Sequence, residues 1–164
     1  MKKLFLIDAY AMIYRAYYAL IRTPRINSKG MNTSAVMGFV NILHEIMTKE
    51  QPDYIAVAFD HGKTFRHDAF PLYKAQREET PEDIRRSVPI IKDILAAWHI
   101  PCLQTDGFEA DDSIGTLAAA VAASNTSKSD SIATGKDDES GENQQVIDTY
   151  MVTGDKDYGQ LVRG

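Results

Sequence analysis

The chain has 164 residues, of which 44% are hydrophobic and 25% are charged, and its formal net charge is −5. This composition is typical of one globular domain or a part of one, and it argues against a disordered or fibrous protein. We see no signal peptide and no apolar run long enough to span a bilayer, and the single cysteine, Cys102, excludes an intramolecular disulfide. We therefore expect a cytoplasmic protein. We also expect it to be a monomer.

The charge is unevenly distributed along the chain. Residues 1–104 contain 14 Lys and Arg against 11 Asp and Glu, a net charge of +3, whereas residues 105–164 contain 4 against 12, a net charge of −8. The acidic average therefore does not exclude a phosphate-rich partner, because basic residues of the first segment could share one face.

In chain order, the first part of the sequence alternates predicted strands and helices. Residues 4–7 form an apolar run that we expect to be a buried strand, and residues 9–21 follow as a helix. Residues 23–32 are rich in turn-forming residues, and a second helix is predicted at 33–49. A second buried strand follows at 54–59.

The next part begins with residues 61–79, which lack clean periodicity and are expected to form an irregular loop or arch. A helix is predicted at 80–98, with Thr80 as its capping residue, Pro81 in its first turn and a kink at Pro89. A short strand at 100–103 and a helix at 108–123 complete this part.

Residues 124–145 are of a different composition, with Ile132 as their only large aliphatic residue, and we predict a disordered surface insert. Residues 146–153 return to a strand pattern. Strands that alternate with helices predict an α/β fold: three layers, with a mostly parallel central sheet and helices on both faces.

Seven acidic residues follow predicted strands or begin a predicted helix. They are Asp8, Asp60, Glu109, Asp111, Asp112, Asp155 and Asp157. Because the carboxyl ends of parallel strands meet at one edge of a sheet, we expect these carboxylates to converge there. Clustered carboxylates repel one another unless a cation neutralises them, and Mg²⁺ or Mn²⁺ suits oxygen ligands. Two such ions could clamp a phosphodiester during its hydrolysis.

Each acidic residue also has a simpler explanation when it is taken singly. An Asp after a strand often caps a turn, and acids in the first turn of a helix complement the helix dipole. The convergence of four separate segments on one sheet edge favours the metal site over these explanations.

Residues 65–77 carry the opposite charge, with basic and aromatic side chains interleaved. This pattern suits a nucleic-acid strand, because cations bind phosphates and rings stack on bases. The alternative is a solvated basic loop whose aromatic residues lie in the core. The residues concerned are Arg66, Lys74 and Arg77 among Phe65, Phe70 and Tyr73. We assign no role to His61 or His67, and we expect Cys102 to be a small buried residue.

Several ordered motifs resemble the 5′-nuclease domain of bacterial DNA polymerase I and, more distantly, flap endonucleases and the PIN-like nuclease superfamily. They cover nearly the whole chain except residues 124–145. The motifs are LIDAY (6–10), YRAY (14–17), AFD (58–60), YKAQR (73–77), GFEADD (107–112), TGDKD (153–157) and QL (160–161).

The resemblance implies a 5′→3′ exonuclease and 5′-flap endonuclease that acts on branched DNA and RNA primers in replication and repair. The family's counterparts of the seven acidic residues surround divalent metal ions. Counterparts of Lys74 and Arg77 lie on a helical arch and contact the reacting phosphate, so these two are the predicted catalytic residues. The predicted DNA-binding residues are Arg15, Arg66, Tyr73, Lys74 and Arg77.

The family's domain continues beyond the end of this chain, with further aspartates and a helix-hairpin region. We therefore expect residues 1–164 to be the N-terminal part of a 5′-nuclease domain, truncated before the helix-hairpin region and linked in its full-length parent to a polymerase domain. One alternative is a non-catalytic module that binds metal and branched DNA. Another is a flavodoxin-like phosphoryl-signalling domain that would carry an acyl-phosphate on Asp60.

Overall fold

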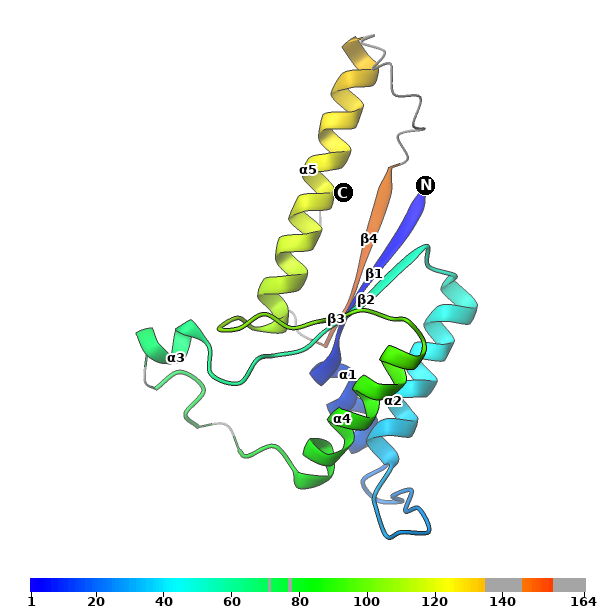
Figure 1. Cartoon of the computed structure of the whole chain (residues 1–164), viewed down its shortest axis with the longest axis vertical. Helices are drawn as coiled ribbons and strands as arrows, with labels where there is room; N and C mark the ends of the chain where they lie inside the picture. Colours follow the sequence, from blue (N-terminus) through cyan, green and yellow to red (C-terminus); the bar gives the residue numbers. More distant parts are fainter. Residues whose placement is uncertain (71, 77, 135–145, 155–164) are drawn as a thin grey trace.

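A parallel four-stranded sheet forms the centre of the computed structural model (Figure 1), which describes residues 1–70, 72–76, 78–134 and 146–154. The strand order is β3-β2-β1-β4, and each neighbouring pair is parallel. The strands are β1 (Lys2–Asp8), β2 (Tyr54–Ala58), β3 (Cys102–Leu103) and β4 (Ile147–Val152). Each crossover between the described strands contains at least one helix, as parallel pairing requires.

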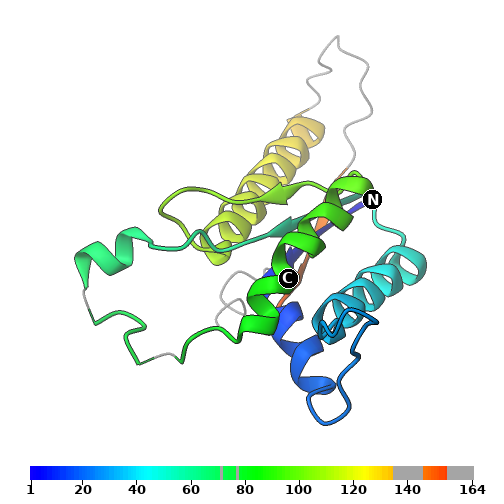
Figure 2. The same cartoon turned by 60° about the horizontal axis from the view of Figure 1, so that its bottom comes forward.

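Helices cover both faces of the sheet. On one face lie α1 (Ala9–Ala19), α2 (Ser34–Glu45) and α4 (Glu82–Ala97), while α5 (Ala110–Thr134) covers the other (Figure 2). A single π-helical turn, η1 (Ile46–Glu50), continues α2, and the short helix α3 (Phe65–Ala69) lies in the segment between β2 and α4.

Alternating residues of the central strands build two separate cores. Ile7 and Val57 are fully buried in the larger core, under α1, α2 and α4, whereas Leu6 and Ala56 pack on the opposite face against Ile114 of α5. The continuous apolar runs of β1 and β2 are therefore explained by burial on both faces. The predicted three-layer α/β fold is confirmed.

Several boundaries differ from the sequence-based expectations. The segment 61–79, which we name the arch, contains the helix α3, because Thr64 and the His67 side chain form a reciprocal cap at its start. Thr80 does not cap α4; its hydroxyl accepts a hydrogen bond from the Tyr14 hydroxyl at 3.0 Å, and Pro81 occupies the capping position. The helix α4 continues on both sides of Pro89, and the kink predicted there stays a prediction.

The last two elements also differ in extent. The helix α5 continues to Thr134, past the predicted end at residue 123, so the first part of the expected insert is helical. Residues 135–145 lie outside the described part of the chain. Cys102 is exposed rather than buried, because β3 is a two-residue strand at the edge of the sheet. No helix among the described residues is long and apolar enough to cross a membrane.

Candidate active site

The carboxyl edge of the sheet opens into a cleft of about 950 Å³. We call this cavity the acid cleft, because four of the predicted acidic residues line it: Asp8, Asp60, Glu109 and Asp111. Asp8 ends β1, Asp60 follows β2, and the other two lie where α5 begins. The strands β1 and β2 are paired, and α5 begins beside them. This arrangement brings together residues that are about a hundred positions apart in the sequence.

Backbone contacts fix two of these carboxylates in place. Asp8 caps α1, because its Oδ1 accepts a hydrogen bond from the Ala11 amide at 3.1 Å, and its Oδ2 accepts one from the Thr153 hydroxyl at 3.2 Å. Asp60 Oδ1 accepts a hydrogen bond from the Ala110 amide at 2.8 Å, which ties the end of β2 to the first turn of α5. The two side chains thus hold the first turns of α1 and α5 at the carboxyl edge of the sheet by hydrogen bonds.

Asp8 is a nearly buried carboxylate of the acid cleft. It is only 9% exposed. Burial raises the pKa of its carboxyl group above the ordinary value, and the negative charges of Asp111 and Asp60 raise that pKa further. Burial and the charge of Asp60 also raise the pKa of the Tyr10 hydroxyl in the same cleft. A bound cation would oppose the causes that raise the Asp8 pKa.

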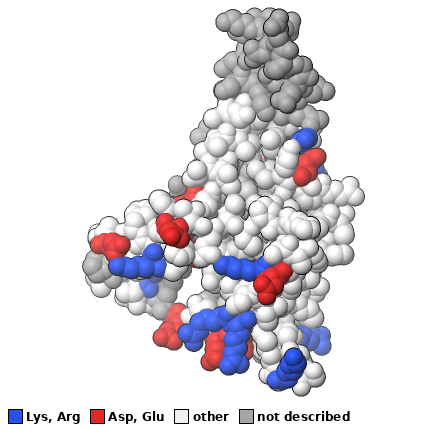
Figure 3. All heavy atoms as spheres, viewed as in Figure 1, with Lys and Arg blue, Asp and Glu red and all other residues white. Residues whose placement is uncertain are grey.

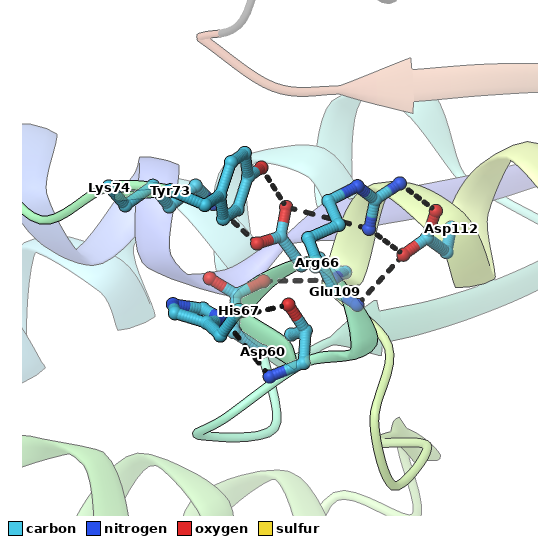
Figure 4. Close-up of polar contacts among 9 residues, drawn as sticks. Asp60, Arg66, His67, Tyr73, Lys74, Glu109 and Asp112 are labelled. Carbon is cyan, nitrogen blue, oxygen red and sulfur yellow. Dashed lines mark hydrogen bonds and ion pairs between the residues drawn. The ribbon is translucent and has the colours of Figure 1, made fainter. Parts of the chain in front are cut away.

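The arch delivers basic and aromatic side chains to Glu109, as Figure 4 shows. Lys74 Nζ donates to Glu109 Oε1 at 2.6 Å, and the Tyr73 hydroxyl donates to Oε2 at 3.2 Å. Lys74 adopts a left-handed backbone conformation with φ of 57°, which is strained for a residue with a side chain. Two consecutive arch residues therefore converge on one buried carboxylate.

Asp112 is held differently from the four residues of the acid cleft. Both of its carboxylate oxygens accept hydrogen bonds from the Arg66 guanidinium, each at 2.7 Å. This ion pair lowers the pKa of Asp112 and raises that of Arg66. Of the two cavities described, Asp112 lines a second one of about 600 Å³, together with Phe108 and Leu117, and does not line the acid cleft.

The other predicted site residues are only partly accounted for. Arg15 is exposed on α1 and does not line the acid cleft. Arg77, Asp155 and Asp157 lie outside the described residues, so their predicted roles stay predictions. On the face seen in Figure 3, the described basic and acidic side chains lie interspersed, most of them over the lower part of the molecule.

The cleft also contains polar residues for which the sequence pattern predicts no site role. Tyr10, Tyr14, His67 and Thr80 line it beside the acidic residues. The spacing of Tyr10 and Tyr14, which follow Asp8 on successive turns of α1, was a usable signal. Nothing in the sequence pattern alone distinguished His67, which lines the cleft while capping α3.

The donor set of the cleft suits a hard divalent cation, although the ligands are not gathered around a single point. Among the described residues, no three acidic, histidine or cysteine side chains are close enough together to hold one ion. Lys74 occupies Glu109 in this arrangement. The chemistry of the carboxylates that line the cleft nevertheless fits Mg²⁺ or Mn²⁺, which prefer oxygen ligands.

Comparison with known proteins supplies the family. A family model described as "5'-3' exonuclease, N-terminal resolvase-like domain" matches residues 3–140. DNA polymerase I of Treponema pallidum is 48% identical over 123 residues, which are 74% of this chain and 12% of the polymerase. A 5'-3' exonuclease of Aquifex aeolicus is 40% identical over 119 residues, which are 72% of this chain and 40% of that protein.

Solved structures agree with this result at the level of the fold. The chain superposes on a T5 5'-exonuclease with divalent metal ions (zinc) bound, with a TM-score of 0.62 and 16% sequence identity over 99% of this chain and 52% of that one. The chain thus spans 12% and 40% of these two curated relatives and about half of the structural neighbour. From the match over residues 3–140, we conclude that the chain belongs to the family of 5′-3′ exonuclease N-terminal, resolvase-like domains.

Proposed function

We propose that this chain carries the active-site part of a divalent-metal-dependent 5′ nuclease, a 5′→3′ exonuclease and 5′-flap endonuclease that hydrolyses phosphodiesters in DNA replication and repair. The observation that carries the proposal is the acid cleft at the carboxyl edge of the sheet, with Lys74 of the arch directed at its buried Glu109. Membership of the exonuclease family supports the same reaction and argues against a phosphoryl-signalling domain.

The residues proposed to hold two Mg²⁺ or Mn²⁺ ions are Asp8, Asp60, Glu109 and Asp111, with Asp155 and Asp157 from outside the described residues. The binding of divalent ions by a T5 5'-exonuclease of similar fold supports this proposal. Ions in such a site supply an activated water and stabilise the leaving oxygen. Asp112 is the least suited of the predicted ligands, because Arg66 already binds both of its oxygens.

The arch residues are proposed to handle the nucleic acid. Lys74 is positioned to exchange its Glu109 partner for a non-bridging phosphate oxygen, because an ammonium group binds either anion. Tyr73 is proposed to stack on a base, and Arg77 and the exposed Arg15 to bind phosphates. The proposed partners are DNA with 5′ flaps or ends, RNA primers and a covalently linked polymerase domain, in a cytoplasmic, monomeric protein.

The test is cleavage of a 5′-labelled flap duplex by the chain in Mg²⁺, in Mn²⁺ and in EDTA. Cleavage that EDTA abolishes and that Asp111→Asn lowers at least 100-fold is the expected result. The matched control is Asp93→Asn, which removes an exposed carboxylate of α4 and leaves the rate unchanged. Retention of intact flap duplex by the folded chain in Mg²⁺, without cleavage, would support the non-catalytic binding module instead.

A further inference from the structure

The arch is joined to the start of α5 by a set of contacts that do not involve the acid cleft. The Arg66 side chain bridges to Asp112 with two hydrogen bonds of 2.7 Å, and its guanidinium lies over the Phe65 ring at 4.6 Å. Phe65 contacts the Phe108 ring, with 5.6 Å between centroids, and its amide donates to the Gly107 carbonyl at 3.0 Å. These contacts fix the first turn of α3 against the turn that begins α5.

Asp112 is fully engaged by protein partners in this arrangement. Besides the two bonds from Arg66, its Oδ2 accepts a hydrogen bond from the Glu109 amide at 3.0 Å. A carboxylate that reaches back to an amide three residues earlier completes a helix cap, and it also holds the backbone of Glu109 in position. Its charge is neutralised by a forked guanidinium, which matches a carboxylate with two parallel hydrogen bonds.

Arg66 likewise has little freedom to serve as a DNA contact. Its side chain is 31% exposed and also lies 4.0 Å from Glu109 Oε2. Breaking its pair with Asp112 to bind a phosphate would leave a partly buried carboxylate uncompensated, which is costly. Lys74 differs in its contacts, because it makes a single ammonium bond to Glu109, whose second oxygen accepts a hydrogen bond from the Tyr73 hydroxyl.

From these contacts we infer that Arg66 and Asp112 are positioning residues. Their ion pair clamps the arch to the start of α5 and thereby holds Lys74 and Tyr73 within reach of Glu109. In this assignment Asp112 is not a metal ligand and Arg66 is not a DNA contact. The inference rests on the proposed function for its catalytic consequence, but the clamp itself is measurable without any cleavage.

The first experiment separates a clamp residue from a ligand, using two adjacent aspartates of α5. Tb³⁺ is the probe, because Tyr10 and Tyr14 line the acid cleft and can sensitise its luminescence. Asp111→Asn is expected to weaken Tb³⁺ binding at least 10-fold, and Asp112→Asn by no more than 3-fold. An equal loss in the two variants overturns the assignment of Asp112.

The second experiment measures the clamp by hydrogen exchange of the arch amides, including that of Phe65. Arg66→Lys keeps the charge but loses the forked geometry, so the clamp predicts that it raises exchange at least 10-fold, as Asp112→Asn does. The variant with both changes is expected to exchange no faster than either single variant, because both remove the same interaction. Wild-type exchange in Arg66→Lys would overturn the clamp.

Kinetics then separates positioning from binding on the flap duplex. Arg66→Lys and Asp112→Asn are each expected to lower kcat at least 10-fold with KM within 2-fold of wild type, because the arch still binds DNA but is misplaced. A raised KM with unchanged kcat identifies Arg66 as a phosphate contact and overturns the inference. If the wild-type chain does not cleave, the proposed function fails, and the exchange and Tb³⁺ results still decide the clamp.

The ion pair of Arg86 with Glu82 on α4 supplies the matched control. It joins the same two charge types at 2.7 Å, but both side chains are more than half exposed. Exposed pairs of this kind contribute little. Arg86→Lys is therefore expected to leave arch exchange, Tb³⁺ binding and kcat at wild-type values.

Discussion

Asp8 combines two roles that oppose each other in the absence of a cation. As the cap of α1, it accepts hydrogen bonds from the Ala11 amide and the Thr153 hydroxyl, which favour folding. As a buried carboxylate near Asp60 and Asp111, it is disfavoured in its charged form, and its pKa is raised. A residue with these properties trades stability for function.

The opposition predicts that Asp8→Asn stabilises the chain at neutral pH. Because the folded pKa of Asp8 lies above its unfolded value, its contribution to stability is full below the unfolded pKa and is lost as pH rises through the folded pKa. Asn keeps an oxygen for the Ala11 amide but carries no charge. The free energy of unfolding in EDTA is expected to rise by about 1 kcal/mol at pH 7.

Urea unfolding of both chains at pH 7 and at a pH below about 4 checks this prediction, since an unperturbed Asp is protonated below that range. The advantage of Asp8→Asn is expected to shrink at the lower pH, where Asp8 is neutral. If the variant is less stable than wild type at pH 7, the free energy lost by weakening the hydrogen bonds of Asp8 exceeds the free energy gained by removing its buried charge.

At the scale of elements, α1 and α2 pack unusually closely where Gly38 faces Ala16. A Cβ built on Gly38 would lie 2.6 Å from the Ala16 Cβ and 3.2 Å from its Cα. A Gly inside a helix ordinarily costs up to about 1 kcal/mol relative to Ala. Its presence in α2 is explained by this close approach of two helix backbones.

Gly38→Ala is therefore expected to destabilise the chain by about 1–3 kcal/mol, despite the gain in helix propensity, because α1 and α2 must move apart. Thermal unfolding followed by circular dichroism measures the effect. Asn41→Ala, at an exposed position of the same helix, is the control and is expected to change the free energy of unfolding by less than about 0.5 kcal/mol. Stabilisation by Gly38→Ala would contradict the packing argument.

Replacing Pro89 with Ala is expected to have the opposite effect on stability from replacing Gly38. Pro89 lies exposed inside α4 and lacks the amide that would bond to the Arg85 carbonyl. Pro89→Ala is expected to stabilise the chain by roughly 1–3 kcal/mol by restoring that bond and relieving the ring's clash. Chemical unfolding measures it. A loss of stability would mean that the proline is required for the path of α4 across the sheet.

The elements show which features sequence patterns can predict. The runs around Ile7 and Val57 predict buried strands because both of their faces are covered. The helix α3 could not be predicted, because its cap pairs Thr64 with a histidine rather than with Glu or Gln. The polar end of α5 could not either, since its composition lacks a hydrophobic stripe to mark a helix.

At the scale of the whole molecule, parallel topology alone accounts for the acid cleft. Asp8 and Asp60 follow neighbouring strands, so the rule that sites form at carboxyl ends predicts their meeting. The rule does not predict which long side chains of the arch contact residues at the start of α5. The sequence pattern therefore predicts a role for the basic residues Arg66 and Lys74, but not their pairing with Asp112 and Glu109.

The same topology predicts that divalent cations stabilise the whole chain. Carboxylates from several segments line one cleft, and a cation that binds only the folded state shifts unfolding by mass action. A concentration 100 times the dissociation constant contributes about 2.7 kcal/mol. For a domain of this size, this corresponds to a rise in Tm of about 5–10 °C.

Thermal unfolding in Mg²⁺ or Mn²⁺, compared with unfolding in EDTA at matched ionic strength, measures this rise in Tm. Asp93→Asn is expected to keep the shift and Asp111→Asn to lose most of it. An equal shift in both variants would mean that the cations act by general screening of the acidic chain rather than at the cleft.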